Sequence, residues 1–149
     1  MSSQDWAYFS NYAIYSAMAL FTLAFFGHAY ETAWAVRTPN AASETEGNLV
    51  TKTFDSSRTQ KAMRIATAMM ILGFLFLLAG VVTRGLSASR VPWGNMYEFS
   101  ITGALAFTGA YLAALRKYDL RWLGVLVSIA ALLTLGTAIT LLYVPSAPL

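Results

Sequence analysis

Four long stretches of apolar residues, separated by polar segments, dominate the pattern along the chain. A helix needs about 20 residues to cross the roughly 30 Å hydrocarbon core of a bilayer, and each stretch is long enough. An apolar surface on every face is typical of a helix surrounded by lipid or buried in a large core. The pattern therefore predicts an all-α integral membrane protein, a four-transmembrane-helix bundle forming a single domain over residues 1–149, with helices at 8–36, 63–83, 96–115 and 122–144.

The composition supports a membrane protein and excludes an ordinary soluble domain. Hydrophobic residues make up 57% of the 149 residues and charged residues only 11%, whereas soluble domains have about 45–50% and about 25%. A soluble domain of this size leaves much of its surface in water and could not bury so much apolar area. We therefore expect the lipid bilayer to be the solvent of the four helices.

The distribution of lysine and arginine predicts the orientation. Eight of these residues flank one side of the four stretches and only Arg84 and Arg90 flank the other. The positive-inside rule places the richer side in the cytoplasm, so we expect an N-out/C-out chain in the plasma membrane of a bacterium and a flexible, polar cytoplasmic loop over residues 37–62. Lipid head groups account for the basic residues, and we expect no nucleic-acid partner. The eight residues are Arg37, Lys52, Arg58, Lys61, Arg64, Arg116, Lys117 and Arg121.

Small residues recur at helical spacing in two of the predicted helices. Gly73 and Gly80 share one face of the second helix. The third helix has a stripe of Gly103, Ala106, Ala110 and Ala113, bordered by Gly109. Such stripes allow helix backbones to approach closely in lipid, so we expect both to lie at helix–helix contacts.

The single histidine, His28, lies inside the first predicted helix, three residues before Glu31. Ionisable residues inside a membrane are expensive and are functional candidates. A neutral imidazole can ligate haem iron, with a carboxylate on its other nitrogen. Alternatively, His28 faces the bundle and hydrogen-bonds a neighbouring helix. The chain has no cysteine, which excludes Cys-based metal sites.

The predicted outer connection contains a distinctive segment over residues 91–100, V-P-W-G-N-M-Y-E-F-S. Asn95 is placed to cap the third helix, with Glu98 three residues later as in a capping box. These local roles explain most of the segment. Trp93, Tyr97 and Glu98 also lie near Arg84 and Arg90 in sequence, and together they would suit a flat, anionic, apolar ligand.

This segment resembles the Pro-x-x-Asn-hydrophobic-Tyr-Glu stretch that opens the cytochrome c assembly domain of the CcsA/ResC proteins. The sequence T-R-G-L at 83–86, L-Y-V at 142–144 and A-P-L at 147–149 are similar to actinobacterial CcsB-like members. The resemblance implies a role in System II c-type cytochrome biogenesis, in which haem is delivered to apocytochrome c on the outer face with a ResB-type membrane partner. Within that family the protein acts as a component of a cytochrome c haem lyase, and we expect this chain not to be catalytic alone.

Two departures from the family shape this interpretation. The family's tryptophan-rich haem-handling segment and its flanking outer histidines normally follow the region seen here, and this sequence contains neither. We therefore expect the chain to correspond to the N-terminal part of such a protein. The alternative is a non-catalytic structural subunit of a membrane complex. A small transporter is less favoured because no helix is interrupted near its midplane.

Overall fold

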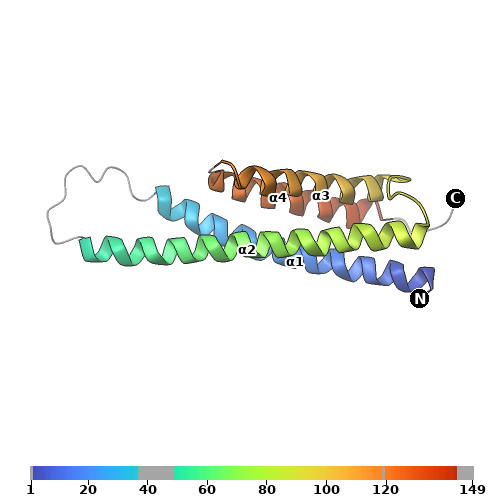
Figure 1. Ribbon diagram of the computed structural model, residues 1–149, viewed down its shortest axis with the longest axis horizontal. Coiled ribbons are helices and arrows are strands. Elements are labelled where there is room, and N and C mark those ends of the chain that lie inside the picture. Colours follow the sequence, from blue (N-terminus) through green and yellow to red (C-terminus); the bar gives the residue numbers. More distant parts are fainter. Residues whose placement is uncertain (1, 37–48, 119, 144–149) are drawn as a thin grey trace.

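The computed structural model describes residues 2–36, 49–118 and 120–143, and over these residues it is an all-α bundle (Figure 1). The helices are α1 (Ser3–Val36), α2 (Leu49–Ala88), α3 (Met96–Leu115) and α4 (Gly124–Leu141), with a short 3-10 helix, η2 (Arg121–Leu123), leading into α4. Each of the four long helices contains a segment long and apolar enough to cross a membrane. The predicted four-helix membrane bundle is confirmed.

The helices form a closed ring in which α1 packs along α2, α2 touches α3, α3 packs on α4 and α4 returns to α1. The α2–α3 side has the fewest contacts of the four. Asn11 near the start of α1 donates a hydrogen bond of 3.0 Å to the Tyr143 hydroxyl, so the two ends of the described chain lie together. We call this end, with the α2–α3 connection, the predicted outer end, and the end at residues 115–123 the predicted inner end.

The contact between α1 and α2 uses the two glycines that the sequence singled out. A Cβ atom at Gly80 would lie 2.7 Å from Ile14, and one at Gly73 would lie 3.1 Å from the Phe21 ring. The Ser10 hydroxyl donates a 2.7 Å hydrogen bond to the Gly80 carbonyl across the same contact. The prediction that this stripe mediates close packing is confirmed.

The small-residue stripe of α3 has a different position. Gly103, Ala106, Ala110 and Ala113 are exposed, and a Cβ atom at Gly103 would meet no atom within 4 Å. Instead, α3 buries the opposite face, including Ile101, Ala104, Thr108 and Tyr111. Within this chain the predicted contact is wrong for these four exposed residues, whereas the bordering Gly109 lies against the Phe74 ring of α2.

Helix α2 is longer than the predicted 63–83 at both ends. Residues 49–62, which the sequence placed in the cytoplasmic loop, are helical. They are polar but contain no proline or glycine, so nothing in them interrupts a helix that continues from the apolar part. The remainder of that predicted loop, residues 37–48, lies outside the described residues. Helix α4 ends at Leu141 rather than at residue 144.

We predict that Gly80→Leu destabilises the bundle, while Gly103→Leu leaves it stable. Both substitutions replace a glycine in a helix, but only the first forces a side chain against Ile14. Overpacking of this kind costs about 1–3 kcal/mol. Thermal unfolding in detergent measures the difference, and equal melting temperatures for the two variants would contradict the described α1–α2 contact.

Candidate functional site

The C-terminal end of α2 carries Arg84 into the bundle. Helix α2 continues for one turn past Arg84 and ends at Ala88. Ser89 then adopts a left-handed conformation with φ of 52°. Its N–H donates to the Leu86 carbonyl, and the Arg90 N–H donates to the Gly85 carbonyl, which together form a Schellman motif. Arg84 is a helical residue whose side chain is fully buried, and its part in a ligand site stays a prediction from the sequence.

The start of α3 has the predicted cap but not the complete capping box. The Asn95 side chain accepts a 2.8 Å hydrogen bond from the Glu98 N–H, which is the expected N-cap interaction. In a capping box the Glu98 carboxylate would return to the Asn95 N–H. Instead, Glu98 Oε2 accepts a 3.0 Å hydrogen bond from the Gly94 N–H. The carboxylate is therefore directed toward the α2–α3 connection.

Glu98 is the centre of a cluster of charged groups. Its Oε2 also accepts from Nη1 of Arg90 at 3.1 Å, and its Oε1 lies 3.5 Å from Nε of Arg84. Glu98 and Arg84 are fully buried, and Arg90 is 24% exposed. The Arg90 guanidinium lies directly across Gly94, where any side chain would collide with it. We call Arg84, Arg90, Gly94 and Glu98 the Glu98 cluster.

Two tyrosines enclose the inner side of the Glu98 cluster. The Arg84 guanidinium carbon lies 5.0 Å from the centre of the Tyr97 ring and 6.0 Å from that of Tyr143. The two rings meet edge to face at 5.3 Å, a favourable aromatic geometry. Tyr97 is buried, at 1% exposure. The Tyr97 ring therefore covers one side of the Arg84 guanidinium.

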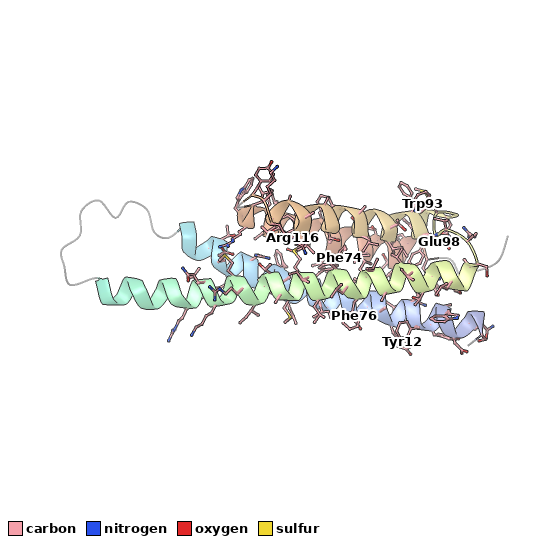
Figure 2. The ribbon with its side chains drawn as sticks, in the orientation of Figure 1. Tyr12, Phe74, Phe76, Trp93, Glu98 and Arg116 are labelled. Atoms are coloured by element: carbon pink, nitrogen blue, oxygen red, sulfur yellow. The ribbon has the colours of Figure 1, made fainter. Side chains whose placement is uncertain are left out.

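Trp93 is the member of the predicted site that faces outward. Its side chain is 66% exposed. Figure 2 shows it at the α2–α3 connection, pointing away from the bundle, whereas Glu98 lies toward the bundle. The loop beneath it is held by the Thr102 hydroxyl, which donates to the Pro92 carbonyl at 3.3 Å. The structure thus brings Arg84, Arg90, Tyr97 and Glu98 together and leaves the Trp93 indole on the surface above them.

The sequence did not identify Asn11 and Tyr143 as parts of this region. The Tyr143 ring lies beside the Arg84 guanidinium, and the Asn11 side chain donates a hydrogen bond to the Tyr143 hydroxyl. The two residues are separated by nearly the whole chain, so their proximity follows from the closure of the four-helix ring. The sequence signal for Tyr143 is that of an aromatic residue near the end of an apolar stretch, which indicates a position at the membrane interface but no partner.

His28 lies far from the Glu98 cluster. Its neighbour Gly27 packs on Ala66 of α2, and residues 66 to 84 of a helix span about 27 Å. The imidazole is 1% exposed and lies against Gly124 at the start of α4, where a Cβ atom would be 2.8 Å from the ring. Glu31 Oε2 is 3.7 Å from Nδ1, which is too long for a hydrogen bond.

Both His28 nitrogens are buried without a hydrogen-bond partner among the described residues. The alternative prediction was a hydrogen bond from His28 to a neighbouring helix. This bond is not formed with any described residue. A haem iron could reach the ring only if α1 and α4 separated, because the ring is enclosed. No group of three or more metal-binding side chains occurs in residues 2–36, 49–118 and 120–143. His28 as an iron ligand stays a prediction from the sequence.

Comparison of the chain with protein-family models, with curated proteins and with solved structures finds no match.

We predict that Glu98→Gln destabilises the protein by about 3 kcal/mol, since removing one partner of a buried ion pair leaves the other charge uncompensated. The loss should be smaller when Arg84→Met is combined with it than the sum of the two single losses. Unfolding of the four proteins in detergent measures this coupling. Strict additivity of the two substitutions would show that Arg84 and Glu98 do not interact.

Proposed function

We propose that this protein is a membrane component of System II c-type cytochrome biogenesis and takes part in haem delivery to apocytochrome c on the outer face of a bacterial plasma membrane. Haem is its cargo, and a ResB-type membrane protein is its partner. The observation that carries the proposal is the segment 91–100, which resembles the CcsA/ResC stretch and forms the surface from which Trp93 projects.

The contacts of residues 91–100 support a role in presenting the exposed Trp93 side chain to a ligand. Asn95 caps α3 and Glu98 joins the loop to α2, so the polar residues of the resembling stretch hold the loop in one conformation. A fixed loop binds a ligand without the entropy of ordering it. Trp93 is the exposed ring on this fixed support, and a porphyrin face would stack on it.

Charge supports an anionic ligand at the same place. The Glu98 cluster contains two guanidinium groups and one carboxylate, so it carries one excess positive charge. Arg90 uses Nη1 for Glu98 and is partly exposed, which leaves further donors for a carboxylate such as a haem propionate. In this proposal Trp93 and Arg90 touch the cargo. Arg84, Tyr97 and Glu98 support them from inside the bundle.

The iron atom would need ligands from elsewhere. The only histidine of the chain is His28, at the opposite end of the bundle and enclosed by α1 and α4. The proposal therefore assigns the axial ligands at the outer face to the ResB-type partner or to apocytochrome c. For the same reason we propose that the chain does not join haem to apocytochrome c by itself.

We predict that Trp93→Ala strongly lowers mature c-type cytochrome in cells that depend on this protein. The control is Phe99→Ala, because Phe99 is also an exposed aromatic residue, at 63%, and lies six residues further along the chain. Haem staining of membrane proteins measures the cytochrome, and immunoblotting checks that both variants accumulate. Normal cytochrome levels in Trp93→Ala cells would favour the structural-subunit alternative instead.

The role of His28 needs a separate measurement. If His28 ligates haem iron, protein purified from haem-replete cells should show a Soret band that is lost in His28→Ala. Thr32→Ala serves as the control, since Thr32 lies one turn further along α1 and donates its hydroxyl to the His28 carbonyl. An unchanged Soret band in His28→Ala would exclude His28 as the ligand while leaving the outer surface at Trp93 untested by this result.

A further inference from the structure

A groove runs between α2 and α3 in the half of the bundle nearer the predicted inner end. It has a volume of about 470 Å³ and is lined by Thr67, Ile71 and Phe74 of α2 and by Gly109, Ala113 and Arg116 on the side of α3. Figure 2 shows Phe74 between the two helices and Arg116 at the end of α3. Helices α2 and α3 also pack less extensively on each other than the other neighbouring helix pairs do.

The shape of the groove follows from particular side chains. The Phe74 ring lies on Gly109, where a Cβ atom would be 3.0 Å from it, and this contact closes the end nearer the Glu98 cluster. Toward the predicted inner end, the small side chain of Ala113 leaves the space between the helices open. A second cavity of about 350 Å³ continues there and shares Thr67 and Ile71 with the first.

Basic residues line the predicted inner end of the groove. Arg116 borders the first cavity, and Arg64 and Arg121 border the second. No aspartate or glutamate lines either cavity within the described part of the chain. Arg116 and Arg64 are exposed, and neither forms an ion pair with another described residue. The groove thus combines an apolar interior with a positively charged entrance at the predicted inner end of the bundle.

We propose that this groove binds an anionic phospholipid of the inner leaflet, with one acyl chain between α2 and α3 and the phosphate between Arg116 and Arg64. A methylene group has roughly the volume of a liquid water molecule, about 30 Å³, so the first cavity has the volume of about 15 methylene groups. Arginine forms paired hydrogen bonds to phosphate. The site goes beyond the proposed role in cytochrome biogenesis and does not depend on it.

The volume argues against a transmembrane helix of another protein as the occupant. A helix about 10 Å wide and 30 Å long occupies roughly 2,400 Å³, several times the volume of the groove. A single acyl chain is narrow enough to enter beside Ala113 and to end at Phe74. The groove is also open to lipid along its length, so a chain can enter sideways from the bilayer.

The test measures lipid binding to the full chain in neutral detergent by native mass spectrometry. The probes are phosphatidylglycerol, phosphatidylcholine and inorganic phosphate. We expect phosphatidylglycerol to bind at least tenfold more tightly than phosphatidylcholine, and the double variant Arg64→Gln, Arg116→Gln to lose this preference. Lys117→Gln is the control, because it removes one positive charge next to Arg116 but does not line the groove. It should keep the preference.

A second variant tests the apolar part of the site. Ala113→Phe fills the groove from an exposed position of α3, so the fold should be retained, and circular dichroism on heating checks this. We expect it to lower the affinity for phosphatidylglycerol about tenfold. Equal loss in Lys117→Gln and the arginine double variant would overturn the proposal. So would competition by inorganic phosphate as strong as that by lipid, displacement of the lipid by an equimolar amount of haem, or normal lipid binding in Ala113→Phe.

Discussion

The arrangement of this bundle depends on one buried charge interaction, that of Glu98 with Arg84 and Arg90. Charges removed from water are costly unless they are paired with opposite charges. Here the carboxylate is bound by two guanidinium groups and one backbone N–H, and the Arg84 guanidinium is covered by two aromatic rings. The interaction joins the last turns of α2 to the first turn of α3. Beyond this junction the Phe74 ring of α2 meets Gly109 of α3, and the groove lies between the two helices on the side of this contact nearer the predicted inner end.

The same interaction divides the candidate site into a support and a surface. Five residues around the α2–α3 connection carried the sequence-based ligand hypothesis, but only Trp93 and Arg90 have exposed surface. The other three are enclosed by the bundle and by Tyr143. A buried ionic cluster that fixes a loop is a common way to hold an exposed side chain in one orientation. The chemistry of the surface is therefore that of one indole ring and one partly neutralised guanidinium.

The sequence was most informative where a single physical constraint decides the structure. The bilayer dictates long apolar helices, so their number and approximate positions could be predicted, and the start of α3 was located correctly because Asn95 has one effective role as a cap. The end of α2 was missed because Ser89 adopts the left-handed conformation in which glycine is the usual signal. With this additional turn of α2, Arg84 belongs to the helix, and its side chain is buried in the bundle. The exposed stripe of α3 was misassigned because small residues permit close packing without requiring it.

Helix α2 is much longer than its membrane segment needs to be. Its 40 residues correspond to about 60 Å, roughly twice the thickness of the hydrocarbon core. Figure 1 shows its first part extending past the ends of α3 and α4. This part lies at the predicted inner end of the bundle, beyond the ends of α3 and α4. Because α2 is one continuous helix, a tilt of this part would be transmitted along it to Arg84.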